Sequence, residues 1–218
     1  MTNQYIIIVA AGMGKRMNLP LPKQFYEIDN KAILQYALEN AKINAPNAEI
    51  ILVLHSDYIQ YWEEYCQKKK YTVDYQIISG GEERYFSVKN ALNLLKDKEG
   101  TVAIQDGVRL FVPQRIWTQG FILAKEKGSA IPILPMVDSM VQQSKDGFIP
   151  VPRNNYKRVQ APQFFNLDLL YSAYFEQAYQ PSFTDDASVF YALGRVSHAL
   201  YMFEGDEINK KITYREDL

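Results

Sequence analysis

The feature that most constrains the fold is a series of short, continuously apolar runs that alternate with amphipathic stretches. The apolar runs are YIIIVA at 5–10, IILVLH at 50–55, TVAIQ at 101–105 and AIPILP at 130–135. The amphipathic stretches, each long enough for a crossover helix, lie near residues 31–43, 57–69, 82–96 and 114–127. Runs rich in Ile and Val are typical of strands buried on both faces of a parallel sheet. We therefore predict an open, mostly parallel α/β sheet with helices on both faces, whose ligands bind beyond the carboxyl ends of the strands.

Residues 138–160 break this alternation. The segment is polar, carries Pro and Gly, and alternates weakly around a Lys-Asp-Gly turn, which predicts a β-hairpin arm that projects from the domain. An arm this polar cannot form a core alone, so we expect it to rest on a partner surface. Helices are expected near 167–178 and 185–193, followed by a strand through 196–203. Because there is no internal repeat or linker, we predict a single domain over residues 1–218.

Charge and cysteine content exclude several classes of partner. Lys and Arg number 24 and Asp and Glu number 25, so the net charge of -1 leaves no global field for holding nucleic acid or an anionic membrane. No apolar run approaches membrane-spanning length, and the N-terminal residues do not have the pattern of a signal peptide. A single cysteine, Cys66, excludes an internal disulfide and fits a reducing compartment. We expect a cytoplasmic protein whose phosphate chemistry, if any, depends on locally placed cations.

The first apolar run ends in a glycine turn, VAAGMGKRM at 9–17. Its two glycines allow a tight turn that points backbone N–H groups at an anion, and its two alanines leave room for a flat ring. The turn lacks the Gly-Lys-Ser/Thr ending of a Walker loop and the third glycine of a dinucleotide turn, so taken alone it fits solvated cations equally well. The candidate nucleotide-binding residues here are Ala10, Ala11, Gly12, Gly14 and Lys15, followed by Arg16.

A second basic position, Lys23, follows Pro22 in the sequence PKQF. Proline restricts the backbone and would hold the lysine in one direction, whereas a solvated surface lysine is the ordinary alternative. Lys15, Arg16 and Lys23 converge on one loop at the end of a strand, where their mutual repulsion requires an anion to offset it. This clustering favours a phosphate site.

Read in order, these motifs resemble the signature of the 2-C-methyl-D-erythritol 4-phosphate cytidylyltransferases. The later matches are GGEERYFSV at 80–88, DGVRLFV at 106–112, VDSM at 137–140, QAPQFF at 160–165, TDDAS at 184–188 and NKKIT at 209–213. The resemblance implies a Rossmann-like nucleotidyltransferase fold and transfer of CMP from CTP to methylerythritol phosphate with release of pyrophosphate. It also implies a role in non-mevalonate isoprenoid precursor biosynthesis and Mg²⁺, or another divalent cation, as cofactor. A sister group that acts on ribitol phosphate shares much of this skeleton.

The implied chemistry can be checked against the residues. The nucleophile is a phosphate monoester whose second pKa is about 6, so it is largely dianionic at neutral pH and needs no general base. The two histidines, His55 and His198, lie in predicted apolar strands and are interpreted as structural. What the reaction needs is positive charge around the phosphorus. The candidate catalytic residues are Arg16, Lys23 and Lys211.

By resemblance, Gly81, Glu82 and Ser87 face the cytosine edge. Glu82 would accept a hydrogen bond from the exocyclic amine of cytosine, a group that uracil lacks. The ordinary alternative is a helix start, where Glu82 and Glu83 suit the helix dipole, and both interpretations can hold together.

Asp106 directly follows a predicted strand, which is where such sheets place carboxylates that contact nucleotide, substrate or metal. An Asx turn with Gly107 is the structural alternative. Arg109 would either pair with Asp106 or hold a substrate phosphate. Gln105 and Leu110 stand where the family usually has histidine and proline.

The predicted arm carries three candidate substrate-binding residues, Asp138, Ser139 and Arg153. In the family the arm crosses between two subunits and its arginine grips the sugar phosphate in the neighbouring site, which implies a homodimer through 138–160. Ala161 replaces the commoner threonine of the family, and this leaves the acceptor open.

The last motifs complete the site. The resemblance places Asn209 near the metal and triphosphate, as a metal ligand beside Asp106. Thr184 is interpreted as a helix N-cap. The expected partners are CTP and a polyol phosphate. Two alternatives stay open: a ribitol phosphate cytidylyltransferase, and an inactive nucleotide-binding regulatory module.

Overall fold

Parallel strands form the centre of the sheet, as the apolar runs predict. The computed structural model describes residues 2–13, 20–194 and 200–217. The four predicted strands are β1 (Gln4–Ala10), β4 (Glu49–Leu54), β6 (Thr101–Asp106) and β7 (Ser129–Pro135). Among the described residues the sheet has the order β10-β7-β11-β6-β1-β4-β5, with β12 also paired to β7. β1 is parallel to both β4 and β6.

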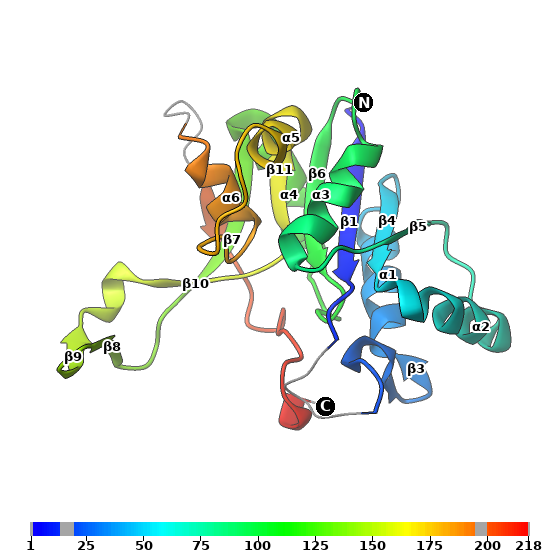
Figure 1. Cartoon of the computed structure of the whole chain (residues 1–218), viewed down its shortest axis with the longest axis horizontal. Coiled ribbons are helices and arrows are strands. Elements are labelled where there is room, and N and C mark those ends of the chain that lie inside the picture. Colours follow the sequence, from blue (N-terminus) through cyan, green and yellow to red (C-terminus); the bar gives the residue numbers. More distant parts are fainter. Residues whose placement is uncertain (1, 14–19, 195–199, 218) are drawn as a thin grey trace.

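Helices cover both faces of this sheet (Figure 1). Along β1, Ile6 and Ile8 point into one core and Tyr5 and Ile7 into the other, which is the alternation expected of a strand buried on both sides. The first core is covered by α1 (Ile33–Asn44), α2 (Ile59–Lys69) and α4 (Gln114–Lys127). The second is covered by α3 (Arg84–Leu94), α5 (Leu167–Phe175) and α6 (Asp186–Ala192). Across the described residues, none of the helices combines the length and apolarity needed to cross a bilayer.

One central strand, β11 (Gln163–Asn166), is absent from the sequence predictions. It lies between β6 and β7 and is antiparallel to both. Its two phenylalanines point to opposite sides, Phe164 into the first core and Phe165 into the second. The sheet therefore becomes mixed at this side, because a four-residue strand with a fully apolar centre fills the gap between two parallel neighbours.

The helices begin or end within a few residues of the predicted stretches, and short elements precede two of them. Strand β3 (Lys31–Ala32) pairs with β2 (Glu27–Ile28), so the first helix begins at Ile33. A 3-10 turn, Ser56–Tyr58, delays α2 to Ile59, and α5 ends at Phe175. The edge strand β5 (Gln76–Ser79) is also additional.

The cap predicted for α6 is wrong by one residue. Asp185, not Thr184, is the N-cap, since its carboxylate accepts the backbone N–H of Ser188 at 2.8 Å and the Ser188 hydroxyl closes a capping box. The last strand, β12 (Met202–Glu204), covers only the end of the predicted 196–203. His198 lies outside the described residues.

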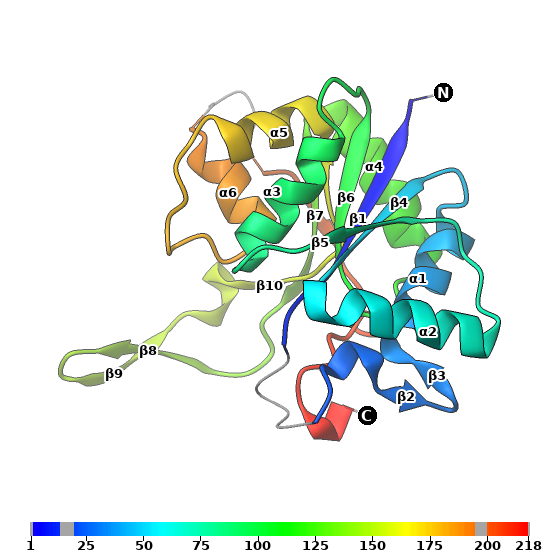
Figure 2. The same ribbon diagram turned by 45° about the vertical axis from the view of Figure 1, so that its right-hand side comes forward.

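The hairpin predicted within 138–160 is present as β8 (Met140–Ser144) and β9 (Gly147–Val151), which form a separate two-stranded sheet. Figures 1 and 2 both show it extending away from the body of the molecule. The chain returns through a 3-10 turn, Arg153–Asn155, to β10 (Lys157–Val159) on the edge of the main sheet.

Candidate active site

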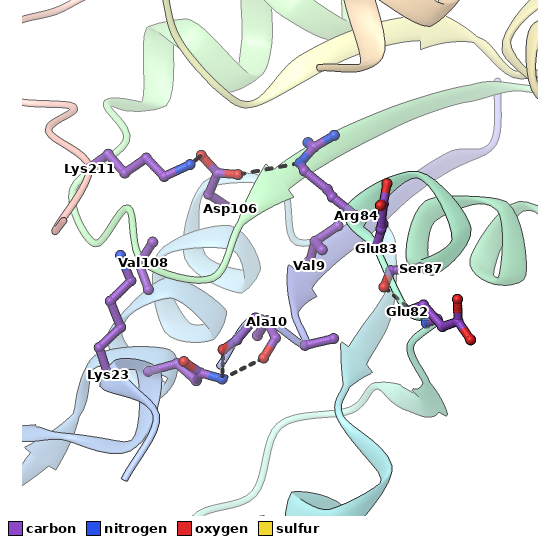
Figure 3. Close-up of a pocket in the computed structure, with 14 residues that line it drawn as sticks. Val9, Ala10, Lys23, Glu82, Glu83, Arg84, Ser87, Asp106, Val108 and Lys211 are labelled. Carbon is purple, nitrogen blue, oxygen red and sulfur yellow. Dashed lines mark hydrogen bonds and ion pairs between the residues drawn. The ribbon is translucent and has the colours of Figure 1, made fainter. Parts of the chain in front are cut away.

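A cavity of about 300 Å³ opens at the carboxyl ends of β1 and β6. Segments that are far apart in the sequence meet there: the end of β1, the 3-10 turn Lys23–Phe25, the start of α3, the end of β6 and the C-terminal segment (Figure 3). The predicted site residues that line it are Ala10, Ala11, Gly12, Lys23, Gly81, Glu82, Ser87, Asp106 and Lys211. Gln24 and Arg84 line it as well, and the sequence analysis gave neither a role.

Close backbone approach shapes the floor of the cavity. A Cβ on Gly107 would lie 2.8 Å from the Cβ of Ala10, and a Cβ on Gly80 would lie 2.5 Å from that of Ala11. Both contacts are too short for a side chain, so the loops after β5 and β6 pack directly on the end of β1. The Gly81 N–H donates to the buried hydroxyl of Ser87 at 3.1 Å, which holds the loop before α3.

Asp106 is the electrostatic centre of the cavity. Its carboxylate lies 3.1 Å from Lys211 Nζ, 3.2 Å from Arg109 Nε and 4.0 Å from Arg84 Nε. Figure 3 shows Lys211 and Arg84 reaching it from opposite sides. Burial by itself would raise the pKa of Asp106, but the positive charges of Lys211, Arg84 and Arg109 outweigh it and hold that pKa well below its usual range. The carboxylate therefore stays ionised at every physiological pH.

Arg84 joins Asp106 to a fully buried carboxylate on α6. Its two terminal nitrogens donate to Asp186 at 2.9 and 2.6 Å, a bidentate pair, and the Tyr174 hydroxyl donates to the same carboxylate at 2.7 Å. Asp186 belongs to the TDDAS motif, for which the sequence predicted only a helix cap. The one available signal was an arginine and an acidic pair in two motifs that lie far apart in the sequence, and no local pattern pairs them.

Arg109 and Asn209 lie behind Asp106 and outside the cavity lining. Of the two roles left open for Arg109, pairing with Asp106 is the one present, and its Nη1 also donates to the Asn209 carbonyl at 2.7 Å. The Asn209 side chain is fully buried and donates to the Ala161 carbonyl at 2.8 Å. Within the described residues its Oδ1 has no hydrogen-bond partner.

These contacts describe the surroundings of the two predicted metal ligands, Asp106 and Asn209. Asp106 already faces three cationic groups, and Asn209 is enclosed behind Arg109. Among the residues that the structure describes, no group of three or more His, Cys, Asp or Glu side chains could hold a metal ion. Within the described residues Asp106 and Asn209 do not form a metal cage by themselves, so their role as metal ligands stays a prediction.

Lys23 is nearly buried, and its ammonium donates to the Ile212 carbonyl at 2.6 Å. This contact joins the 3-10 turn Lys23–Phe25 to the C-terminal segment that carries Lys211. Figure 2 shows this C-terminal segment next to β2 and β3. The remaining candidates of the glycine turn, Gly14, Lys15 and Arg16, lie outside the described residues.

The candidates on the arm do not reach this cavity. Asp138 and Ser139 are exposed just before β8. Arg153 is exposed after β9, and its guanidinium donates to the Val137 carbonyl. None of the three lines the cavity of its own chain.

Comparison with known proteins gives one consistent family. The family model described as 2-C-methyl-D-erythritol 4-phosphate cytidylyltransferase matches residues 4–218. A curated protein of that name from Bacteroides fragilis is 42% identical over 212 residues, 97% of this chain and 94% of the relative. One from Phocaeicola vulgatus is 39% identical over 216 residues, 99% of this chain and 96% of the relative. The crystal structure of 4-diphosphocytidyl-2C-methyl-D-erythritol synthase from Anaerococcus prevotii superimposes with a TM-score of 0.83 at 25% identity, covering 99% of this chain and 92% of the other.

Proposed function

The chain belongs to the 2-C-methyl-D-erythritol 4-phosphate cytidylyltransferase family, and we propose that the cavity around Asp106 is where it carries out the family reaction. The protein is a CTP-dependent cytidylyltransferase of isoprenoid biosynthesis that transfers CMP to methylerythritol phosphate and releases pyrophosphate. The match across residues 4–218 carries the assignment, together with a cavity lined by the residues of its motifs. The ribitol phosphate and regulatory alternatives are not favoured, because the relatives are named for methylerythritol phosphate.

The reaction forms one bond and breaks one at the α-phosphorus of CTP. An oxygen of the acceptor phosphate attacks, the bond to the bridging oxygen of the β-phosphate breaks, and pyrophosphate leaves with that oxygen. Because the attacking phosphate is already largely dianionic, no side chain has to remove a proton. Among the described residues the cavity is lined by Lys23, Arg84 and Lys211 but by no histidine, which suits stabilisation by charge.

We assign the transferring phosphoryl group to Lys23 and Lys211, with Arg16 as a third cation from the glycine turn. The Lys211 side chain is 40% exposed and forms an ion pair with Asp106, so its ammonium can turn toward an entering phosphate. Lys23 lines the cavity from the turn that follows Pro22, and its ammonium now donates to the Ile212 carbonyl. A lysine acts as a compact point charge, which suits phosphate oxygens whose position changes during the reaction.

The nucleotide is assigned to the loops around β1 and α3. Ala10, Ala11 and Gly12, with Gly14 and Lys15 beyond them, would receive the ribose and phosphates. Gly81, Glu82 and Ser87 would meet the cytosine. Glu82 is exposed just before α3, so its carboxylate is available to accept from the exocyclic amine of the base.

Asp106 and Arg109, with Asp138, Ser139 and Arg153 of an arm, are assigned to the acceptor. Arg109 is buried and engaged with Asp106 and a carbonyl, which favours a role in holding Asp106. Magnesium or another divalent cation is proposed to enter with the triphosphate, near Asp106 and Asn209, because the described side chains do not form a metal cage by themselves.

We propose further that the chain is a single cytoplasmic nucleotidyltransferase domain that works as a homodimer through the 138–160 arm. An isolated two-stranded hairpin is marginally stable in water. This one exposes three large apolar side chains, Val141, Phe148 and Ile149. A second copy that covers them would also bring Arg153 to the neighbouring cavity.

The assignment is tested by pyrophosphate release with CTP and magnesium against a panel of polyol phosphates. We expect turnover with methylerythritol phosphate and little with ribitol phosphate; the reverse preference would overturn the acceptor. Lys23→Ala should lower kcat by roughly 10²–10³-fold, the loss typical of one group that stabilises transition-state charge. The matched control is Lys125→Ala, on the exposed face of α4.

The shared site has its own test. Lys23→Ala and Arg153→Ala subunits are each expected to be inactive, and mixing them should restore activity, because one site of a mixed dimer then carries both wild-type residues. Verified mixed dimers that stay inactive would refute the swapped arm while leaving the catalytic assignment standing.

A further inference from the structure

Gln24 is a buried glutamine that lines the cavity and has no role in the function proposed above. It lies in the 3-10 turn Lys23–Phe25 and is 3% exposed. Its Nε2 donates to the Ala10 carbonyl at 2.7 Å and to the Gly12 carbonyl at 3.0 Å. Figure 3 draws both bonds as dashed lines beside Ala10. One side chain therefore holds two carbonyls of the glycine turn.

These two bonds also fix the direction of the neighbouring amides. In a trans peptide the C=O and the N–H on the next residue point in opposite directions. With the Ala10 and Gly12 carbonyls turned toward Gln24, the N–H groups of Ala11 and Met13 face the other way, away from that side chain. These two N–H groups, two residues apart, thus lie on the same side of the turn, where they can both donate to an anion.

The turn that carries Gln24 is itself firmly held. Phe25 packs edge-on against Tyr61 of α2, with ring centroids 5.2 Å apart, and its N–H donates to the Pro22 carbonyl at 3.0 Å. On its other side, the Lys23 ammonium is bound to the Ile212 carbonyl. Gln24 is thus presented from a rigid element to a glycine turn that is conformationally permissive by itself.

The residue type matches this task. An amide side chain offers two N–H donors without a charge, whereas an ionised glutamate offers acceptors only and methionine offers no donor. A carboxylate here would face two carbonyl oxygens. A lysine would add a charge that competes with the neighbouring cations for phosphate.

We propose that Gln24 is a positioning residue for CTP: it holds the glycine turn in the conformation whose Ala11 and Met13 N–H groups receive the triphosphate. The proposal rests on the cavity being the CTP site. It predicts an effect on nucleotide binding that is larger than any effect on the acceptor.

The first test is Gln24→Met, which keeps the length of the side chain and removes both donors. Titration calorimetry with CTP and magnesium should show a dissociation constant raised about tenfold or more, the size expected for two lost hydrogen bonds. The KM for CTP should rise with it, while the KM for the polyol phosphate should change less than about twofold, well under 1 kcal/mol.

The matched control is Gln35→Met. Gln35 is also a buried glutamine, 9% exposed, whose Nε2 donates to Glu39 at 2.9 Å, but it lies on α1 away from the cavity lining. It should lower the melting temperature and leave CTP binding unchanged. Equal CTP affinities for Gln24→Met and wild type would overturn the proposal, as would an equal loss of affinity in Gln35→Met.

Gln24→Glu gives a second, pH-dependent signature that a purely structural role would not produce. Its carboxylic acid regains one donor when protonated, and burial against two carbonyls raises the pKa of such a group. We expect its CTP affinity relative to wild type to recover as the pH is lowered from 8 to 6; a flat ratio contradicts the proposal. If wild type itself fails to bind CTP, the proposed function fails instead, so the two failures are distinguishable.

Discussion

Removing the negative charge of Asp106 should lower the free energy of unfolding, because three cationic groups surround its carboxylate. Asp106→Asn keeps the shape of the side chain but leaves three cations around a neutral amide, with Lys211 Nζ 3.1 Å, Arg109 Nε 3.2 Å and Arg84 Nε 4.0 Å from the present oxygens. At an effective dielectric constant of about 20, one such contact corresponds to about 4 kcal/mol of gross Coulomb energy at 4 Å.

The net effect is smaller than the gross sum, for reasons that the structure identifies. Arg84 is already balanced by Asp186, and Lys211 is 40% exposed, so solvent screens it. Arg109 is left as a buried guanidinium without its charge partner. Breaking one buried pair costs roughly 3–5 kcal/mol, so we expect a loss of about 3 kcal/mol in the free energy of unfolding.

The pH dependence has a definite sign. The folded-state pKa of Asp106 lies below its unfolded value, so its contribution to stability is complete above the unfolded pKa of about 3.9 and is lost as the pH falls toward the folded pKa. The difference in stability between wild type and Asp106→Asn should therefore be constant from pH 5 to pH 8. It should narrow below about pH 4.

Urea unfolding followed by tryptophan fluorescence measures this difference, since Trp62 and Trp117 are both fully buried and report on the whole fold. Asp97→Asn, at an exposed loop position, is the control and should change stability by less than about 0.5 kcal/mol. An Asp106→Asn variant as stable as wild type would refute the electrostatic reasoning. A stability gap that persists unchanged at low pH would do so as well.

Two further substitutions test the packing behind the site. Asp186→Asn should lower the free energy of unfolding, measured with urea, by roughly 3–5 kcal/mol. The buried carboxylate of Asp186 now accepts hydrogen bonds from the Arg84 guanidinium and the Tyr174 hydroxyl, and the substitution replaces it with a neutral amide. A near-neutral result would show that the Arg84–Asp186 pair is dispensable. Gly120→Ala should lower stability by about 1–3 kcal/mol or more, since its Cβ would lie 2.2 Å from the Phe164 ring. An unchanged melting temperature there would mean that α4 shifts freely on the sheet.

The parts of the fold that followed from the sequence are those in which one local pattern decides the structure. The run at 101–105 is buried on both faces and forms β6, and the stretch at 114–127 forms α4 with the predicted bounds. The strand at Gln163–Asn166 did not follow, because four residues carry no periodicity that separates a strand from a helix. Its place in the sheet depends on neighbours more than thirty residues away in sequence.

The residues of the candidate site divide in the same way, into those that local motifs predict and those that only the fold brings together. Lys23, Asp106 and Lys211 were predicted because each lies in a motif, and the topology brings them to one cavity. The Arg84–Asp186 pair joins positions 102 residues apart, and nothing in either motif specifies the other. Gln24 was not predicted for a different reason. Its hydrogen bonds go to backbone carbonyls, and no pattern of residues in the sequence specifies the direction of a carbonyl.

The cations around Asp106 differ in how firmly the fold holds them, and this difference bears on catalysis. Arg109 is buried and holds both the Asp106 carboxylate and the Asn209 carbonyl, and Arg84 is bound bidentately to Asp186. Lys211 is the most exposed of the three and has a flexible stem. An entering phosphate therefore competes with Asp106 for Lys211 far more easily than for either arginine. Asp106 keeps its two arginines when Lys211 turns to the phosphate, so charge reaches the reacting centre without a buried carboxylate being left unpaired.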